Sequence, residues 1–487
     1  MIDGAVRYDV TESILETGIP SVRNPIFEVS AGRGGHFYSF YPIGHSLTAL
    51  PFVYLGAALG NGSLEAKQFA FSLTTIPFAA GAVSLLFLIY GRLGCTPRRA
   101  LTWALVVAFC TLLWPYAGST FDSAIQAFWL TLAVWGALEA IAAHTLRWSA
   151  VSGIAFAMLI NLQEFYVVLG ACVLAGAPLT WATLGRRLQS RVVHVMLLGV
   201  VAGTLLVLAY NLLKFGNPLD TGRTAAPHPF IGNPLRGFAG LAISPAKSVF
   251  LYAPPYAMAM IGLRRLFRRS PDLFAPVIAC VVIHVALIST LRFWAGEWAW
   301  GPRYLVASLP LACIGLPFAW EAATRRHVAL GLCTLGLVVQ LLAISVDHQR
   351  YYLQRSLSPY FWTDDAIMYT DSPLLARPFE VMAVWDGSER AAARALVPNL
   401  LPLSMTSVIL GPPPVLLPYA SEWMRRYMVF SLPRPWTLWS RFLADGQKPG
   451  PTGVMTMAGL AVALASFGGL ALVLRSAPPD EQQAQEK

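Results

Sequence analysis

Long apolar runs constrain the fold of this chain more than any other feature of its sequence. Most of them hold roughly the 17 to 25 residues that an α-helix needs to cross a bilayer, with few charges inside the run. The runs lie at residues 69–91, 99–117, 122–143, 148–163, 165–184, 192–213, 248–263, 273–291, 303–320, 328–346 and 454–474. We therefore predict an all-α polytopic membrane protein with about eleven transmembrane helices.

Composition agrees with this class and excludes a soluble enzyme. Charged residues make up 12% of the 487 residues, against about 25% in soluble domains, and hydrophobic residues make up 56%. The runs are continuous, whereas the strands of a membrane β-barrel alternate over segments of roughly 10 residues.

Arginines predict the orientation of the bundle. They gather in alternate loops, which are expected to be cytoplasmic, and these loops contain Arg92, Arg98, Arg99, Arg147, Arg186, Arg187, Arg191, Arg264, Arg265, Arg268, Arg269, Arg325, Arg326 and Arg475. The net charge of +10 therefore indicates anionic headgroups of the lipid bilayer as a partner, and no nucleic acid. The extracytoplasmic side of what we expect to be a bacterial inner membrane then receives residues 1–68, the turns near 118–122 and 163–164, the loops 214–247 and 292–302, and the segment 347–452.

Four parts follow from this topology. Residues 1–68 form a polar external loop of the kind that carries catalysis, with interfacial helices such as 44–61. Residues 69–346 form the transmembrane bundle, 347–452 an external segment or small domain, and 453–487 the last transmembrane helix with a cytoplasmic tail. The six cysteines show no spacing that indicates a disulfide framework or a zinc site.

The first candidate for chemistry is the string DGAVRY, which places Asp3 beside Arg7 and Tyr8. An ionised carboxylate at a membrane surface can take a proton from an acceptor hydroxyl or orient a metal ion. The alternative for Asp3 is a solvated surface acid.

A second candidate is the string GGHFYSFYPIGHS at 34–46. His36, Tyr38, Tyr41 and His45 alternate there with glycine and proline, and aromatic faces with hydroxyls suit a sugar. An interfacial aromatic belt is the alternative, and neither histidine has a partner at metal-ligand spacing.

Two further acidic positions lie at external ends of spans. Asp122 could be a site residue or an acid that complements the dipole of the helix that follows. Asn161, Gln163 and Glu164 form a polar cluster that we interpret as an ordinary loop.

The string RFWAGEWAWGPRY at 292–304 is the most unusual in the chain. It packs Glu297 and Trp298 between spans, and Arg303 begins the next run. A guanidinium matches a phosphate with two parallel hydrogen bonds, so we expect an anion site on this face. The cations expected there are Arg223, Lys247, Arg292 and Arg303, and snorkelling in an aromatic belt is the alternative.

Several of these strings resemble, in order, the bacterial integral-membrane glycosyltransferases of the GT-C superfamily. The strings are DGAVRYDVTESILETG, HFYSFYPIGHSLTALPFVYLG, YNLLKFGNPLDTG, AISPAKSVFLYAPP and WAGEWAWGPRYLVASLPL. The resemblance is greatest to family 39-like enzymes that use polyprenyl-phosphate sugars and are related to protein O-mannosyltransferases and the aminoarabinose transferase. It extends from residue 3 to about 320.

This resemblance implies a GT-C-like bundle with an extracytoplasmic active site and a polyprenyl-phosphate sugar as donor. It implies a catalytic role for Asp3, a matching role for Asp122, and a donor-phosphate contact for Arg303, which we extend to Lys247 and Arg223. Arg7, Tyr8, His36, Tyr38, Tyr41, Glu297 and Trp298 are the expected substrate contacts. The family also has a transmembrane helix before Asp3, so we expect a start codon placed too late or a truncated relative.

From these residues we predict an inverting hexosyl or pentosyl transfer to a lipid, glycan or protein acceptor. No cofactor is certain, although a divalent metal such as Mg or Mn fits the two aspartates. The alternatives are a flippase or transporter of a lipid-linked or anionic solute, and a catalytically dead GT-C-like protein. A transporter is expected to carry ionisable residues near the membrane midplane.

Overall fold

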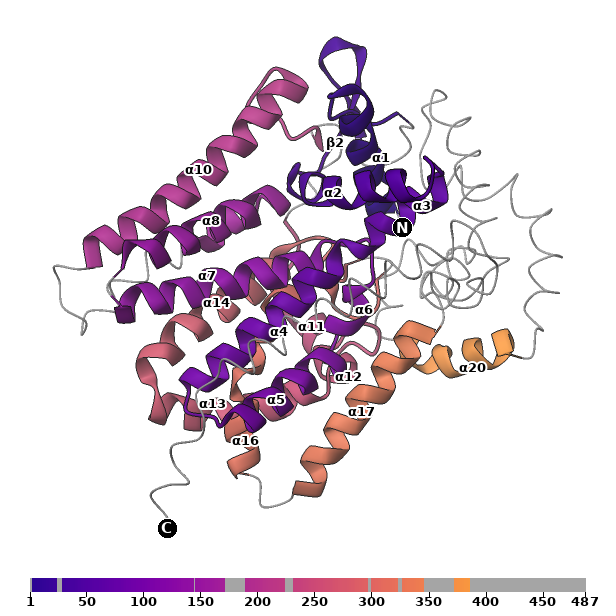
Figure 1. The fold of residues 1–487 in the computed structure, drawn as a ribbon. Helices are drawn as coiled ribbons and strands as arrows, with labels where there is room; N and C mark the ends of the chain where they lie inside the picture. Colours follow the sequence, from indigo (N-terminus) through magenta and orange to yellow (C-terminus); the bar gives the residue numbers. More distant parts are fainter. Residues whose placement is uncertain are drawn as a thin grey trace.

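A computed structural model describes residues 2–23, 29–143, 145–170, 189–223, 231–296, 299–322, 326–345 and 372–385. These residues form helices and, among them, one antiparallel pair of short strands (Figure 1). The N-terminal elements are α1 (Ile2–Thr17), β1 (Val29–Ala31), η1 (Arg33–Gly35), β2 (Phe37–Ser39), α2 (Gly44–Leu59) and α3 (Leu64–Leu73). The bundle follows with α4 (Thr75–Arg92), α5 (Pro97–Phe109), α6 (Leu113–Ala117), α7 (Ser123–Ala143), α8 (Leu146–Leu162) and α10 (Gln189–Phe215). It continues with α11 (Pro234–Ile243), α12 (Val249–Tyr252), α13 (Pro255–Arg269), α14 (Pro271–Thr290), η3 (Arg303–Ser308), α15 (Leu309–Ala312), η4 (Cys313–Gly315), α16 (Leu316–Ala322), α17 (Arg326–Ser345) and α20 (Pro373–Trp385).

The described residues confirm an all-α polytopic membrane protein. Four of their helical stretches are long and apolar enough to cross a bilayer, namely Ala66–Arg92, Arg191–Phe215, Arg303–Glu321 and Arg326–Ser345. Large apolar side chains on α10 and α17 point outward, as expected for helices that face lipid. The total of about eleven stays a prediction, because the predicted runs at 165–184 and 454–474 lie largely or wholly outside the described residues.

Prolines divide two runs that we predict as single spans. The run 99–117 is α5 followed by α6, and the break precedes Pro115, which has no N–H to donate to the carbonyl four residues earlier. The run 248–263 is α12 followed by α13; its break contains Pro254, and α13 begins at Pro255. Both breaks therefore follow from the missing proline donor.

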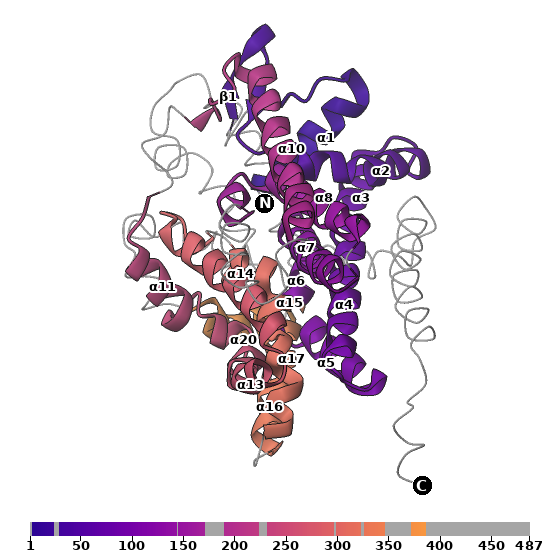
Figure 2. The same cartoon turned by 90° about the vertical axis from the view of Figure 1, so that its left-hand side faces the viewer.

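Small residues let two bundle helices approach closely. Gly199 and Gly203 of α10 lie against Gly153 and Ala157 of α8, where a Cβ on either α10 glycine would overlap the α8 backbone. This four-residue spacing of small residues is a common way for membrane helices to pack without a hydrophobic driving force. α4, α7, α8 and α10 consequently form one row, and α13, α14, α16 and α17 lie beside it (Figures 1 and 2).

The arginines that we predict to be cytoplasmic meet acidic partners at one end of this bundle. Arg92 at the end of α4 pairs with Glu139 near the end of α7, and Arg99 at the start of α5 lies 2.7 Å from Glu321 of α16. Helices α1 and α2 and the strands lie at the opposite end (Figures 1 and 2). The 21 residues of α7 span about 30 Å, the thickness of a hydrocarbon core, between the two ends.

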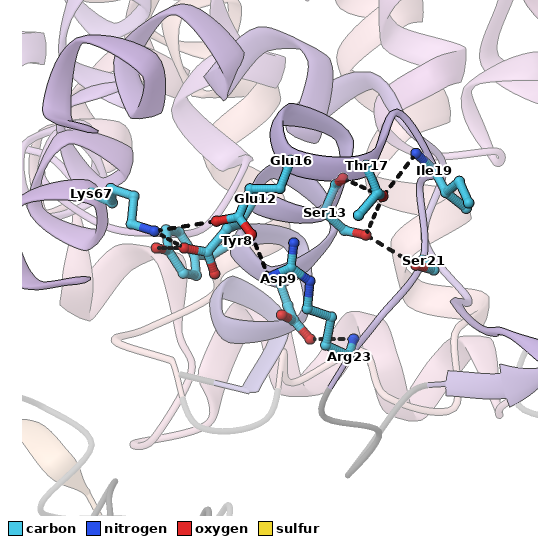
Figure 3. Close-up of polar contacts among 10 residues, drawn as sticks. All are labelled: Tyr8, Asp9, Glu12, Ser13, Glu16, Thr17, Ile19, Ser21, Arg23 and Lys67. Atoms are coloured by element: carbon cyan, nitrogen blue, oxygen red, sulfur yellow. Dashed lines mark hydrogen bonds and ion pairs between the residues drawn. The ribbon is translucent and has the colours of Figure 1, made fainter. Parts of the chain in front are cut away.

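The polar start of the chain, which we predict to be a loop, instead forms helix α1. Two of its acidic side chains are paired with a lysine, because Lys67 of α3 contacts Glu12 and lies 3.5 Å from Glu16 (Figure 3). Arg23 lies 2.8 Å from Glu16, and its backbone N–H donates to Asp9 at 2.8 Å. The hydrogen bond from Arg23 holds the pKa of Glu16 below its usual value. Ion pairs thus fasten α1 to α3 and to the chain that follows it.

Candidate active site

The turn between α6 and α7, residues 118–122, is where the predicted site residues converge. A side chain of α4 holds the backbone of this turn, because the Thr75 hydroxyl donates to the carbonyls of Ala117 and Ser119 at 2.8 and 3.1 Å. The last residue of the turn, Asp122, accepts a backbone hydrogen bond from Gln126 at the beginning of α7. The turn is therefore a rigid platform at the end of the bundle opposite the arginine–glutamate pairs.

Asp122 forms an ion pair with Arg7 of α1. A guanidinium nitrogen of Arg7 lies 2.9 Å from Asp122 Oδ2, and the side chains of the two residues are only 2% and 7% exposed. A charge removed from water in this way is costly unless it is paired, so each residue requires the other. The sequence predicted both residues for the site but did not predict their contact.

Two glutamine amides complete the environment of the Asp122 carboxylate. Gln163 Nε2 donates to Oδ2 at 3.2 Å, and Gln126 forms a second side-chain hydrogen bond. Burial alone would raise the pKa of Asp122, but the charge of Arg7 and the hydrogen bonds from Arg7 and Gln126 hold this pKa below its usual value. Asp122 is consequently an ionised anchor for the groups around it.

The other face of Arg7 meets the start of α2. The guanidinium lies over the ring of Tyr41, 4.3 Å from its centroid, and 3.3 Å from Nδ1 of His45. Burial and the charge of Arg7 lower the pKa of His45 to about 3, so the imidazole is neutral near pH 7 and Nδ1 can accept from the guanidinium. Gly44, the residue before His45, packs directly on the backbone of Asn161 and so lets the start of α2 lie close to the end of α8.

The first turn of α1 lies against the same platform. A Cβ at Gly4 would overlap the side chain of Thr120, so only glycine permits this contact. The backbone of Asp3, the predicted catalytic residue, is therefore next to the turn, one helical turn before Arg7. The side chain of Asp3 lies outside the described residues.

Arg303 reaches the platform from the other side. Its guanidinium lies 4.4 Å from the ring centroid of Phe121, and it donates to the hydroxyl of Tyr304 at 3.0 Å. Gly296, at φ +69°, packs on the stem of Arg303, where a Cβ would be only 2.7 Å from Cγ. The start of α1 thus contacts Thr120, Arg303 contacts Phe121, and Arg7 contacts Asp122.

Lys247 lies behind the loop that carries Arg303. It is fully buried, and its ammonium donates to the carbonyls of Ala299 and Gly301 at 2.7 and 3.4 Å. The loop is also held by Tyr116, whose hydroxyl donates to the carbonyl of Trp300 at 2.8 Å. These bonds fix the backbone from which Arg303 projects.

A further cation comes from the segment 347–452, in which we predicted at most a small external domain. Helix α20 packs against α17 and buries Arg377, whose guanidinium lies 5.0 Å from the ring centroid of Trp300. Sequence analysis did not single out Arg377, because nothing in the local sequence separates it from the other arginines near the predicted aromatic belt.

Three predicted site residues form a separate group at the end of α10. Tyr38 packs on His36 and on Phe215, with centroids 6.3 and 6.1 Å apart. Arg223 lies near Glu164 and Lys214, and burial raises the pKa of Glu164 although these cations oppose the rise. The structure therefore does not bring Arg223, His36 or Tyr38 to the platform by any described contact.

The remaining predicted residues are Tyr8, Glu297 and Trp298. The hydroxyl of Tyr8 donates to Glu12 at 3.0 Å, and its ring packs edge-on against Phe71 of α3, so it supports α1 on α3. Glu297 and Trp298 lie outside the described residues.

The described residues contain no group of three His, Cys, Asp or Glu side chains that could hold a metal ion. The oxygens of Asp122 face Arg7 and two glutamine amides. The side chain of Asp3, the other aspartate of the expected metal site, lies outside the described residues, so a divalent metal stays a prediction and no step below passes through one.

Sequence reasoning missed Gln126 and interpreted Gln163 as part of an ordinary loop. His45 was noted only for its aromatic surroundings. The hydrogen bonds Arg7–His45 and Asp122–Gln163 join residues that lie 38 and 41 positions apart. A search for polar residues at the external ends of different spans would have selected both Gln163 and Asp122, but it would not have shown that the two are in contact.

No protein-family model and no curated protein matches this chain. Among solved structures, ArnT from Cupriavidus metallidurans in the apo state aligns with a TM-score of 0.48 and 16% identity, over 95% of this chain and 72% of that chain. The same ArnT bound to undecaprenyl phosphate aligns with a TM-score of 0.46 and 16% identity, over 88% and 72%. The archaeal oligosaccharyltransferase AglB from Archaeoglobus fulgidus, in complex with an inhibitory peptide and a dolichol-phosphate, aligns with a TM-score of 0.45 and 14% identity, over 69% and 51%. A likeness of this size concerns the backbone path alone.

Proposed function

We propose that this chain transfers a sugar from a polyprenyl-phosphate donor to a hydroxyl or amine of a lipid, glycan or protein at the extracytoplasmic face of the membrane. The observation that supports the proposal is the convergence at residues 120–122. The start of α1, a buried guanidinium–carboxylate pair and a second guanidinium meet there, at one end of an apolar bundle. The strings that resemble GT-C glycosyltransferases contain the start of α1, Arg7 and Arg303, and the resemblance implies a matching role for Asp122.

The cations of the platform suit a leaving group that gains negative charge. When the bond between the sugar and the phosphate breaks, charge develops on the phosphate oxygen, and a fixed guanidinium nearby stabilises it. Arg7 is paired with Asp122, and Arg303 is the second guanidinium at the turn; Lys247 and Arg377 lie around the Trp300 loop behind it. Arg303, Lys247 and Arg377 project from backbone that is itself fixed by hydrogen bonds or packing.

The transfer step is a direct displacement at the anomeric carbon. The acceptor oxygen or nitrogen forms a bond to this carbon while the bond to the phosphate oxygen breaks, and the polyprenyl phosphate leaves with the electron pair. The acceptor proton moves to the carboxylate of Asp3, and the configuration of the sugar inverts. The sugar transferred is a hexose or a pentose.

Asp122 has a supporting role in this proposal. Its carboxylate already accepts hydrogen bonds from Arg7, Gln163 and Gln126, and its lowered pKa makes it a weak base. We therefore assign the proton transfer to Asp3, and assign to Asp122 the placement of Arg7 and, through it, of α1.

The test is the variant Asp3→Asn in the full chain, reconstituted in nanodiscs with undecaprenyl-phosphate-linked hexoses, pentoses and aminopentoses and a bacterial membrane-lipid extract as acceptor. Release of undecaprenyl phosphate, measured by mass spectrometry, should fall at least 100-fold, while protein yield and thermal stability stay unchanged. Glu16→Gln, which removes an exposed carboxylate from the same helix, is the matched control and should keep the wild-type rate. Full activity of Asp3→Asn would overturn the assignment of Asp3, and no release by the wild-type chain from any donor would overturn the function.

A transporter remains the second candidate because of one observation. His284 is fully buried within α14, one of the predicted spans, where an ionisable residue is a feature of transport proteins. A fluorescent undecaprenyl-phosphate analogue that crosses liposome bilayers only when the protein is present would favour transport over transfer.

A further inference from the structure

A chain of buried polar side chains runs from Asp122 into the middle of the bundle. Its members come from four places in the sequence that meet only in the fold: α7, the residues just after α8, α14 and η3. Their hydrogen bonds join Gln126 to Tyr166 at 2.8 Å, Tyr166 to His284 Nε2 at 3.5 Å, and His284 Nδ1 to Ser308 at 2.9 Å. The rings of Tyr166 and His284 are stacked nearly parallel, with an interplanar angle of 8°.

The direction of every hydrogen bond in this series follows from the negative charge of Asp122 at its end. An ionised carboxylate only accepts, so Gln126 presents its amide N–H to Asp122 and its Oε1 must accept from the hydroxyl of Tyr166. The oxygen of Tyr166 then accepts from Nε2–H of His284. Nδ1 of the same neutral imidazole must accept, and Ser308 donates to it at 2.9 Å in preference to the carbonyl of Leu305, which lies farther away at 3.4 Å.

All donors therefore point toward Asp122. In a buried chain of this kind each hydrogen bond polarises the next, and the last donor binds the carboxylate more strongly than an isolated amide would. The chain also removes a freedom that Gln126 would otherwise have, because an amide whose oxygen is held by Tyr166 cannot rotate its N–H away from Asp122.

We infer that four side chains act as positioning residues for Asp122 in the proposed sugar transfer. They are Gln126, Tyr166, His284 and Ser308. They fix the orientation of the carboxylate and, through its ion pair, the position of Arg7 and of the first turn of α1, where Asp3 stands. This role rests on the proposed function, but the state of Asp122 can be measured without it.

Tyr166→Phe is the variant that tests the chain, because it removes one hydroxyl and keeps the stacked ring. Tyr90→Phe is the matched control: Tyr90 is equally buried, and its hydroxyl donates to the carbonyl of Cys313 at 2.8 Å, away from Asp122. We expect Tyr166→Phe to lower kcat for release of undecaprenyl phosphate at least 10-fold with KM for the donor within twofold of wild type. Tyr90→Phe should keep both constants within twofold, and equal effects of the two variants would show that the chain is merely structural.

Two substitutions of His284 add a rescue test. The amide of glutamine can occupy the place of Nε2 and that of asparagine the place of Nδ1, so His284→Gln keeps the bond to Tyr166 and His284→Asn does not. His284→Gln should therefore retain at least half of the activity, whereas His284→Asn should resemble Tyr166→Phe. The opposite order would mean that the contact of Nδ1 with Ser308, and not that of Nε2 with Tyr166, supports activity, and it would overturn the proposed connection of His284 to Asp122.

A second measurement needs no transfer activity. Dicyclohexylcarbodiimide enters membranes and modifies protonated carboxyl groups, and peptide mass spectrometry locates the adduct. At pH 6, labelling of Asp122 should rise at least threefold in Tyr166→Phe and not in Tyr90→Phe, because the variant loses the fixed donor that favours the ionised carboxylate. If the wild-type chain releases no undecaprenyl phosphate but the labelling changes as stated, the proposed function fails and the positioning chain stands. If labelling is the same in all three proteins, the positioning chain fails.

Discussion

The guanidinium of Arg7 and the carboxylate of Asp122 lie 2.9 Å apart in the protein interior, and they join the beginning of α1 to the beginning of α7. No other described ion pair of the chain is buried to this degree on both sides. The pair is the centre of the candidate site, because Tyr41, His45, Gln126 and Gln163 all contact one of its two members.

Removal of one partner of this pair should be strongly destabilising. Asp122→Asn leaves the buried charge of Arg7 without its counter-ion, and we expect a loss of about 3 to 5 kcal/mol in the free energy of unfolding. Arg23→Ala breaks the exposed pair with Glu16 and should cost no more than about 1 kcal/mol. Denaturant unfolding in detergent measures both, and equal losses would contradict a special role of the buried pair.

The contact between Gly4 and Thr120 should tolerate no side chain. Gly4→Ala forces α1 away from the turn, and an overpacked contact costs about 1 to 3 kcal/mol. In α4, Gly91→Ala adds a methyl group where nothing lies within 4 Å, so it should be neutral or stabilising by up to about 1 kcal/mol. Thermal unfolding of the two variants in parallel checks the difference, and a neutral Gly4→Ala would mean that the turn can move.

Arg303 should contribute to the binding of a lipid phosphate. A charge-assisted hydrogen bond contributes about 1.5 to 3 kcal/mol, so Arg303→Gln should weaken the binding of undecaprenyl phosphate by about 10- to 150-fold. Arg292→Gln removes the same charge from an exposed position of the same loop and should change the affinity less than threefold. Native mass spectrometry or a thermal-shift titration with undecaprenyl phosphate measures both, and equal losses would indicate a general effect of charge.

The free energy of unfolding should fall as the pH is lowered, because of His45. Because the pKa of His45 is lowered to about 3 from an ordinary 6.5, the unfolded chain binds more protons than the folded chain between these values, and stability falls as the pH falls through this window. The lowered pKa of Asp122 extends the same direction of change to more acidic pH. Arg7 and Asp122 are the charged groups that face His45.

The corresponding experiment compares wild type with His45→Gln from pH 7.5 to 5. One titrating group of this kind accounts for a slope of up to about 1.4 kcal/mol per pH unit. His45→Gln should therefore show a flatter dependence of the unfolding free energy on pH below about 6.5. Parallel curves for the two proteins would show that His45 is accessible to protons in the folded state.

The apolar runs were enough to predict the class of fold, because a bilayer permits few structures and a helix of some 20 apolar residues is one of them. The runs did not predict where helices break. The break before Pro115 was readable from proline chemistry alone, whereas the closeness of Gly199 to Gly153 required knowledge of which helices are neighbours.

The candidate site shows the same division. The sequence by itself determined which polar residues belong to the predicted extracytoplasmic face, and Arg7, Asp122, Lys247 and Arg303 were selected from its loops and from the external ends of spans. Only the tertiary structure decided which residues they contact. It paired Arg7 with Asp122, placed Lys247 behind the Trp300 loop, and put Arg223 near Glu164 at the end of α10. It also connected Asp122 to His284, 162 positions away, through two side chains. The physical reason is that burial in lipid acts on each residue locally, while hydrogen bonds and ion pairs depend on contacts between distant segments.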